Sequence, residues 1–100
     1  MTGFDAVIHP PARLQIMAVL TEVQDAEFAL LRSTTGVSDS VLSKHLSALA
    51  EAGYVALRKA ASDGRSRTWA SATRAGRKAF ASHVAALTAL AKVADRVAAE

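Results

Sequence analysis

The first half of the chain repeats apolar side chains at the three- and four-residue spacing of an amphipathic helix. A first helix is predicted after Pro10-Pro11, since proline is tolerated in a first turn, and its apolar stripe is Leu14, Ile16, Met17, Leu20 and Val23. A second, shorter helix is predicted from a cap at Asp25 to the stretch 34–36. A third is predicted from a cap at Ser38 to Gly53, and its inward face is Val41, Leu42, His45, Leu46, Leu49 and Ala50. Helix, glycine turn and helix in this order are typical of a helix-turn-helix.

The period of the pattern changes from about 3.6 to about 2 after Gly53, where Tyr54-Val-Ala-Leu57 alternates as a strand does. A second strand, from Thr68 to Thr73, is predicted to pair with the first across a loop that contains Asp63-Gly64 and is longer than two residues. A long helix is predicted from there to about residue 97. The predicted fold is mainly α with a small β-hairpin (α+β). It consists of a winged helix-turn-helix core at about 10–72 and a C-terminal dimerisation helix at about 74–98.

The predicted C-terminal helix carries an apolar seam at the a/d spacing of a coiled coil, formed by Phe80, His83, Leu87, Leu90, Ala94 and Val97. Its first turns can pack on the same domain. A chain of 100 residues makes one domain, which is too small to cover the seam beyond Leu87. We therefore expect a homodimer contact along this helix, and the alternative is a helix that packs only on its own domain.

Composition adds a charge asymmetry to this picture. Hydrophobic residues make up 51% of the chain, and the 23 alanines among them favour helices over strands. Cysteine is absent, which excludes disulfides, thiolate metal sites and cysteine nucleophiles. The net charge is +3, but segment 58–78 holds seven basic residues against the single acid Asp63, so it is locally +6 and the remainder is −3. Such an asymmetry indicates an anionic partner on one face.

Several other function classes find no support in the residues. The N-terminal stretch lacks a basic segment and a long apolar run, so we expect no signal peptide, no membrane span and a cytoplasmic protein. His9, His45 and His83 are dispersed, without a carboxylate or nucleophile at catalytic spacing, and no glycine-rich phosphate loop is present. We therefore expect no enzyme activity, no metal and no cofactor. A pH-sensing or metal site at His83 with Asp95 or Glu100, across a two-fold axis, is the alternative left open.

The third predicted helix and the hairpin carry chemistry suited to duplex DNA. A recognition helix presents short hydrogen-bonding side chains to the major groove, and the outward positions of 38–53 are Ser38, Asp39, Ser40, Ser43, Lys44 and Ser47. The basic wing at 58–72 offers Lys59, Arg65 and Arg67 to phosphates or a narrow minor groove. Asp63 is expected either to pair with Arg65 and fix its direction or to cap the turn. An ordinary solvated face is the alternative for the helix alone, and the adjoining wing favours DNA binding.

In this combination the chain resembles winged-helix transcriptional regulators of the MarR/ArsR-like kind, in their short subgroup. The likeness covers nearly the whole chain, and the matching stretches are His9–Met17, Phe28–Arg32, Leu42–Val55, Asp63–Trp69 and Thr73–Phe80. The resemblance implies a homodimer that represses transcription from a pseudo-palindromic operator in double-stranded DNA. Recognition helices would enter successive major grooves, with the wings beside them.

The chain departs from this family at two places that set further expectations. The strand before the last helix reads Ala70-Ser-Ala72 where the family usually has larger residues, so we expect a loosely packed wing base. The helices that wall the ligand pocket of longer MarR proteins are missing, so a small-molecule effector is expected at the dimer interface, near Phe4, Ile8, Phe80 and Leu87. The rival from another class is a winged-helix module whose C-terminal helix binds a different protein.

Overall fold

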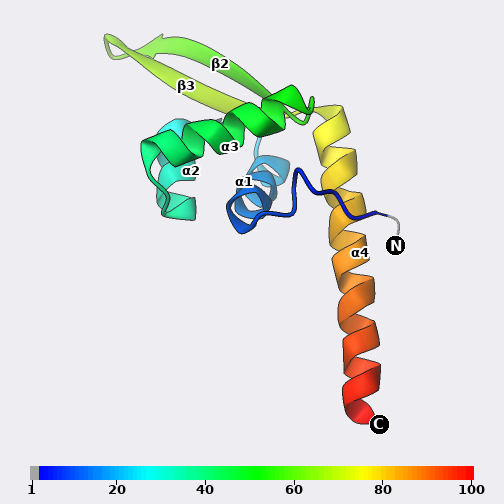
Figure 1. Cartoon of the computed structure of the whole chain (residues 1–100). Helices are drawn as coiled ribbons and strands as arrows, with labels where there is room; N and C mark the ends of the chain where they lie inside the picture. Colours follow the sequence, from blue (N-terminus) through cyan, green and yellow to red (C-terminus); the bar gives the residue numbers. More distant parts are fainter. Residues whose placement is uncertain (1–2) are drawn as a thin grey trace.

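Three short helices support a β-hairpin, and one long helix leaves the domain at a corner (Figure 1). The computed structural model describes residues 3–100. Its elements in chain order are α1 (Pro11–Glu22), β1 (Ala26–Glu27), α2 (Phe28–Thr35), α3 (Asp39–Glu51), β2 (Val55–Ser62), β3 (Arg65–Ala72) and α4 (Arg74–Ala99). The predicted α+β winged-helix architecture is confirmed.

The sheet has a third strand that the sequence pattern did not predict. Strand β1 pairs antiparallel with β3, Ala26 opposite Ala70 and Glu27 opposite Trp69, so the strand order is β1-β3-β2. The predicted helix cap at Asp25 is therefore wrong. Glu27 occupies the N-cap position of α2 without a side-chain cap bond, and the Asp25 carboxylate instead binds Arg58 of β2 at 3.1 Å.

The hairpin is longer and its turn tighter than predicted. Strands β2 and β3 pair from Val55 opposite Ala72 to Ser62 opposite Arg65, which leaves a two-residue turn at Asp63-Gly64. Both turn residues have positive φ, 52° and 76°, as the hairpin turn that matches strand twist requires. The expected longer loop is wrong because the outer half of the hairpin has no buried face, so its sequence lacks the alternation by which strands are recognised.

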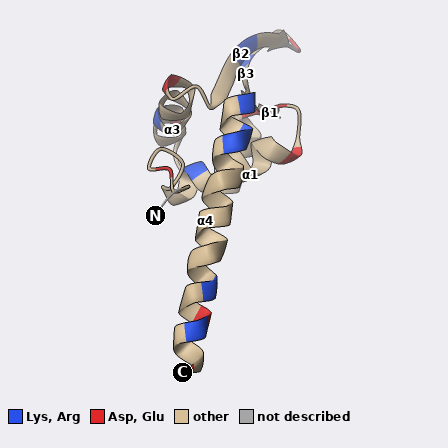
Figure 2. Ribbon diagram, turned by 90° about the vertical axis from the view of Figure 1, so that its right-hand side faces the viewer, with Lys and Arg blue, Asp and Glu red and all other residues tan. Residues whose placement is uncertain are grey.

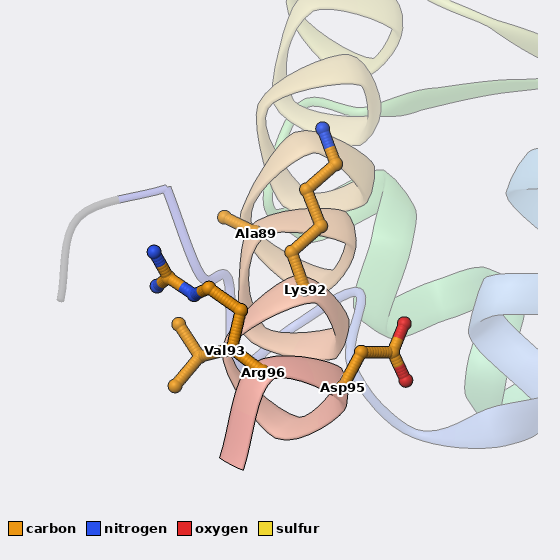
Figure 3. A pocket seen from close by; sticks show the side chains of 5 residues that line it. All are labelled: Ala89, Lys92, Val93, Asp95 and Arg96. Atoms are coloured by element: carbon orange, nitrogen blue, oxygen red, sulfur yellow. The ribbon is translucent and has the colours of Figure 1, made fainter. Parts of the chain in front are cut away.

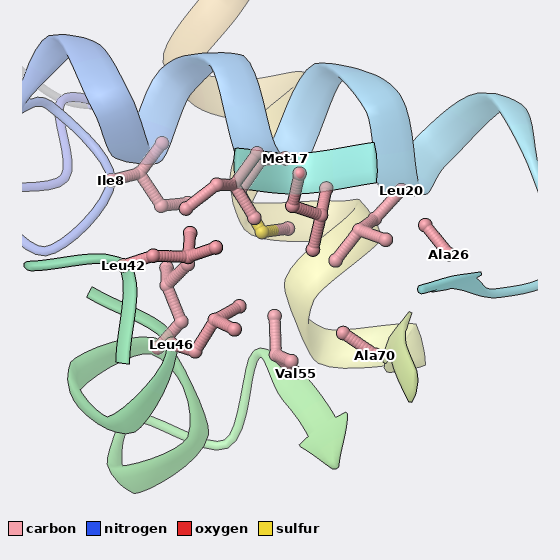
Figure 4. Close-up of a cluster of buried hydrophobic side chains, with 11 residues drawn as sticks. Ile8, Met17, Leu20, Ala26, Leu42, Leu46, Val55 and Ala70 are labelled. Carbon is pink, nitrogen blue, oxygen red and sulfur yellow. The ribbon is translucent and has the colours of Figure 1, made fainter. Parts of the chain in front are cut away.

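The helices and the base of the sheet share one core (Figure 4). It contains Ile8, Ile16, Met17, Leu20, Ala26, Leu31, Leu42, Leu46, Leu49, Val55 and Ala70. Val41 was expected on the inward face of α3 but is 40% exposed. The expected loose wing base is also wrong: Ala70 is only 2% exposed, and its small side chain allows Ala26 to pair directly opposite it.

Local capping sets the ends of the helix-turn-helix as predicted. Ser38 is the N-cap of α3, where its hydroxyl accepts a hydrogen bond from the Val41 amide at 3.3 Å. Gly36 closes α2 in the left-handed region with φ 72°, and Gly53 follows α3 with φ 81°. These are the positions where a serine acceptor and a glycine without Cβ are favoured.

The start of α4 is fastened to the junction between α3 and β2. Thr73 caps the helix by accepting from the Gly76 amide at 3.0 Å, its own amide donates to the Tyr54 carbonyl at 3.0 Å, and its hydroxyl donates to the Gly53 carbonyl at 2.6 Å. Gly76 lies so close to Tyr54 that a Cβ would stand 2.1 Å from the Tyr54 oxygen. Arg77 adds hydrogen bonds to the Thr21 and Val23 carbonyls at the end of α1.

The distal half of α4 projects beyond the domain. All side chains from 88 to 100 are exposed, and Figure 3 shows Lys92, Val93, Asp95 and Arg96 spread around this part of the helix. None of the helices in the described range 3–100 combines the length and apolar character needed to cross a membrane.

Residues 3–9, which we call the strap, lie between α1 and α4 (Figure 1). The Gly3 backbone lies against α4, where a Cβ would stand 3.1 Å from the Ser82 carbonyl oxygen. Beneath the strap, His83 of α4 has no exposed surface.

Candidate nucleic-acid interface

The outward face of α3 carries the predicted recognition residues. Leu42, Leu46 and Leu49 are buried and hold the opposite face of the helix on the core. The structure leaves all six predicted side chains exposed, namely Ser38, Asp39, Ser40, Ser43, Lys44 and Ser47. Four of them, Ser40, Ser43, Lys44 and Ser47, can exchange hydrogen bonds with base edges or phosphates while the helix backbone stays fixed. The Ser38 hydroxyl already serves as the cap acceptor, and the Asp39 carboxylate is bound by Arg32.

The acid of this face is neutralised by an arginine that the sequence pattern did not indicate. The Asp39 carboxylate accepts a hydrogen bond from Arg32, in the last turn of α2, at 2.9 Å, and both side chains are exposed. A free carboxylate at the start of a recognition helix would repel phosphates, and the ion pair with Arg32 reduces this repulsion. The i+7 spacing across a turn has no local signature, and only the angle between α2 and α3 brings the two residues together.

The wing separates its three predicted cations. Arg65 and Arg67 alternate along β3 and so share one face of the hairpin, as predicted, whereas Lys59 pairs opposite Thr68 and lies on the other face. Arg65 and Lys59 are exposed, and neither makes an ion pair within residues 3–100. These two side chains are the wing cations that remain free for an anionic partner.

Arg67 has a different environment from the one predicted. Its guanidinium binds Glu27 of β1 at 2.7 Å, and both side chains are about one-third exposed or less. Its Nε is buried without a partner in the described chain. Arg67 therefore fastens β1 to β3 at the wing base, and its role as a DNA-binding residue of the wing stays a prediction.

Asp63 forms no ion pair with Arg65 in the part of the chain that the structure describes, so the pairing expectation is wrong. It occupies the first position of the hairpin turn with φ 52°, where aspartate is one of the few residues tolerated. The other expectation, a role in the turn, agrees with this position.

The ion pairs of the wing reduce the charge asymmetry of the sequence, but segment 58–78 remains the positive part of the chain. Two of the seven basic residues of segment 58–78, Arg58 and Arg67, are bound to Asp25 and Glu27. In Figure 2 the Lys and Arg residues of α4 gather at its first turns and near its distal end, and the stretch between them carries no charge. The first group, Arg74, Arg77 and Lys78, is exposed and extends the positive surface from the wing base.

His45 connects α3 to α1. It is half-buried, and its Nδ1 accepts a hydrogen bond from Arg13 Nε at 3.0 Å. Burial and the neighbouring Arg13 charge lower the pKa of His45 below its usual range. The imidazole is therefore neutral at physiological pH, in agreement with the inward position predicted for it.

The predicted dimer seam divides into two parts. His83 is completely buried in its own chain, so the expected exposed seam position is wrong for this residue, as is its use with Asp95 or Glu100 across a two-fold axis. Phe80 packs against the core from the edge. The distal seam residues are uncovered, with Leu90 45% exposed and Val97 66% exposed.

The expected effector region coincides with a surface cavity only in part. Phe4 and Leu87 line a cavity of about 460 Å³ together with His9, His83 and Leu90. Ile8 is fully buried in the core, and Phe80 lines a separate groove beside Thr21 and Val84. No group of three side chains able to hold a metal ion occurs among the residues from 3 to 100.

Comparison with known proteins agrees with this architecture. The family model described as a winged helix DNA-binding domain matches residues 12–91. The uncharacterized protein MJ0432 of Methanocaldococcus jannaschii is 30% identical over 86 residues, which are 86% of this chain and 94% of that protein.

Two solved structures are similar over most of the chain. A transcriptional regulator homologue from Pyrococcus horikoshii OT3 superposes with a TM-score of 0.82 at 26% identity, over 89% of this chain and 88% of that one. A protein described as a MarR-family transcriptional regulator, from Enterococcus faecalis V583, superposes with a TM-score of 0.79 over 95% and 86% of the two chains. At 17% identity the second likeness shows the fold alone.

Proposed function

The chain belongs to the winged-helix DNA-binding domain family, and on this basis we propose that it is a homodimeric transcriptional repressor that binds a pseudo-palindromic operator. In this proposal α3 enters the major groove and the wing lies along the neighbouring backbone. In this proposal the protein is a cytoplasmic binding module rather than an enzyme.

The observation that carries the proposal is the exposed polar face of α3. Ser40, Lys44 and Ser47 succeed one another along one side of the helix, and all three are exposed. Buried leucines on the other side of α3 anchor it to the core, so the helix can enter the major groove of DNA while it keeps its position in the fold. Short serine side chains let the helix backbone approach the base edges, and Lys44 reaches further to a guanine or a phosphate.

The proposed dimer rests on α4. A helix of 26 residues is about 39 Å long, and its distal apolar side chains, Leu90, Val93 and Val97, are all exposed. Burying this stripe against the same stripe of a second copy gives a two-fold contact. Two recognition helices related by that axis would meet half-sites about one helical turn, roughly 34 Å, apart.

Selection of binding sites from random duplexes, followed by affinity measurements at several salt concentrations, tests the proposal. We expect symmetric half-sites, a selected duplex that binds about 10³-fold or more tightly than a scrambled one, and affinity that falls steeply with salt. The Arg65→Ala variant should weaken binding to most sequences and reduce the salt slope by about 1, whereas Lys44→Ala should also change the base preference.

Lys92→Ala is the matched control, because Lys92 is an exposed cation on distal α4. We expect this variant to bind like the unmodified protein. Equal, weak affinity for the selected and scrambled duplexes would reject sequence-specific binding. A Lys92→Ala effect as large as that of Arg65→Ala would show that the interface lies elsewhere.

The rival function is a winged-helix module whose α4 binds a different protein, and the same exposed stripe supports it. Sedimentation separates the two. A dimer that dissociates on Leu90→Lys favours the repressor, and a stable monomer that binds a foreign helix favours the rival.

A small ligand at the cavity beside Phe4 and Leu87 is a further proposal that is compatible with the first, and a ligand-induced rise in melting temperature tests it.

A further inference from the structure

The hydrogen bonds around His83 allow very few proton positions. This imidazole has no exposed surface. Its Nδ1 accepts the Asp5 amide hydrogen at 2.9 Å, and its Nε2 lies 3.1 Å from Nδ1 of His9. Because a backbone amide can only donate, His83 Nδ1 must be without a proton.

The missing proton on His83 Nδ1 also determines which nitrogen of His9 carries the proton. With Nδ1 unprotonated, a neutral His83 carries its hydrogen on Nε2 and donates it to His9 Nδ1. The proton of His9 is then on Nε2, the nitrogen that makes no bond to His83. An additional proton on either ring places two hydrogens face to face, at the Asp5 amide or between the two imidazoles. Both contacts therefore exist together only when both histidines are neutral.

These contacts are a large part of what holds the strap on α4. Phe4 packs edge-on against the His83 ring, with ring centroids 5.7 Å apart, and His9 does so at 5.1 Å. On its other side the strap is fastened to the winged-helix body. The Asp5 carboxylate accepts a hydrogen bond from the Tyr54 hydroxyl, and the Val7 carbonyl accepts one from Arg13. Within the strap, the Val7 and Ile8 amides donate to the same Asp5 carboxylate.

We propose that the strap is an acid-released clamp. It binds α4 to the winged-helix body while His83 and His9 are neutral, and it separates from α4 when either ring gains a proton. A proton gained by His83 breaks its contact with the Asp5 amide, and a proton gained by His9 breaks the contact between the two rings. The adjoining cavity beside Leu87 and Leu90 offers space into which the strap can move. Histidine is the side chain that changes charge between about pH 5 and pH 8.

The other titratable groups around the clamp do not change charge in that range. Although burial pulls the pKa of Asp5 upward, the hydrogen bonds from the Tyr54 hydroxyl and the two strap amides outweigh it and hold that pKa below its usual range, and a charge on His83 would lower it further. The hydrogen bond to Asp5 raises the pKa of Tyr54. Arg13 of α1 stays charged and donates to the Val7 carbonyl at 3.1 Å, and Arg77 of α4 is turned toward α1 carbonyls.

Release of the clamp bears on DNA binding through the position of α4, and this step rests on the proposed function. Without the strap, the helix keeps its fastening at Thr73 and Gly76 but loses support along its third and fourth turns, where the strap contacts Ser82, His83 and Ala86. In a dimer joined through distal α4, a tilt of that helix changes the separation of the two recognition helices. Operator affinity is therefore expected to fall in acid while each winged helix stays folded.

Nuclear magnetic resonance on the whole protein tests the clamp without DNA. Nitrogen-15 shifts should show His83 with hydrogen on Nε2 alone at pH 7.5. The exchange protection factor of the Asp5 amide should fall by about tenfold or more between pH 7.5 and pH 5.5, while core amides such as that of Leu46 keep theirs. An unchanged Asp5 protection factor at pH 5.5, or a His83 proton on Nδ1, overturns the proposal.

Glutamine variants separate these two histidines from other acid effects. Glutamine can accept with its oxygen and donate with its nitrogen but does not titrate. The His9→Gln/His83→Gln variant should retain Asp5 protection at pH 5.5 to within about twofold, and acid loss as large as in the unmodified protein overturns the proposal. If substitution of the buried His83 prevents folding, the His9→Gln variant is measured alone. Loss of Asp5 protection should then require a proton on His83, because His9 no longer offers a second site for protonation.

His45→Gln tests the competing acid route, because His45 accepts at Nδ1 from Arg13, and Arg13 also donates to the Val7 carbonyl of the strap. This variant should leave the acid release of Asp5 in place. Operator affinity at pH 7.5 and pH 5.5 completes the test: we expect a fall of about tenfold in the unmodified protein and little change in the double glutamine variant. If no duplex is bound at either pH, the proposed function fails, and the amide measurements still decide the clamp.

Discussion

Replacement of Gly76 by alanine should destabilise the protein strongly, because this position joins α4 to the rest of the fold. An alanine Cβ would stand 2.1 Å from the Tyr54 carbonyl oxygen and within 2.9 Å of two further Tyr54 backbone atoms, whereas ordinary contacts begin at 3.4 Å. The obstacle is backbone, so no side-chain rotation relieves it, and the start of α4 must move by more than 1 Å.

The magnitude follows from three contributions. Overpacking of this kind costs about 1–3 kcal/mol. The movement also strains the Thr73 hydrogen bonds to Tyr54 and Gly53, each worth about 1 kcal/mol. Against these, alanine improves helix propensity by at most about 1 kcal/mol. If both bonds are lost, the net loss is about 2–4 kcal/mol, which lowers the melting temperature of a domain of this size by roughly 8–32 °C.

Urea and thermal unfolding followed by circular dichroism measure the effect, at one fixed protein concentration because the proposed dimer would contribute to stability. Gly36→Ala is the matched control. That glycine has φ 72°, and a Cβ added there would have no atom within 4 Å, so the variant carries backbone strain of about 1 kcal/mol without a clash. A Gly76→Ala protein as stable as Gly36→Ala would refute the close approach of α4 to Tyr54.

Further variants probe the cap, the wing base, the seam and the recognition-helix histidine. Ser38→Ala removes the acceptor of the Val41 amide and should cost about 1 kcal/mol in urea unfolding. Arg67→Gln should cost roughly 1 kcal/mol through its bond to Glu27 yet change DNA affinity less than Arg65→Ala in the same salt titration. Leu90→Lys should shift sedimentation toward the monomer, and an unchanged profile would exclude distal α4 as the contact. The pKa of His45 is lowered in the folded chain, so as the pH falls below about 6.5 this imidazole is protonated in the unfolded chain before it is protonated in the folded one. The free energy of unfolding should therefore decrease from there toward pH 5, and it should decrease less in His45→Gln.

Much of the helix-turn-helix could be predicted from the sequence because its determinants are local. A serine that caps α3 and the glycines that end α2 and α3 act on backbone groups only a few residues away. Their effect is the same in any context that permits a helix. The outward position of Lys44 and its neighbouring serines follows from the same helical period that places Leu42 and Leu46 in the core.

Other features depended on residues that meet only in the folded chain. Strand β1 is two residues long, too short for any alternation, and exists because β3 has a free edge beside it. The role of Arg67 was decided by Glu27, 40 positions away. His83 lies at an a/d position of its helix, but the strap, 78 positions earlier at Asp5, covers it and removes it from the seam.

The order of residues along the chain is therefore enough to specify the cap that begins α3, the glycines that end α2 and α3, which face of α3 is polar and that the last helix has an apolar stripe. Packing of the folded chain established which cations remain free, which part of the stripe stays exposed and which histidines touch. Periodicity and capping arise from bonds between near neighbours along the chain. Ion pairing and burial depend on the distances between elements, and those distances are set only when the core packs.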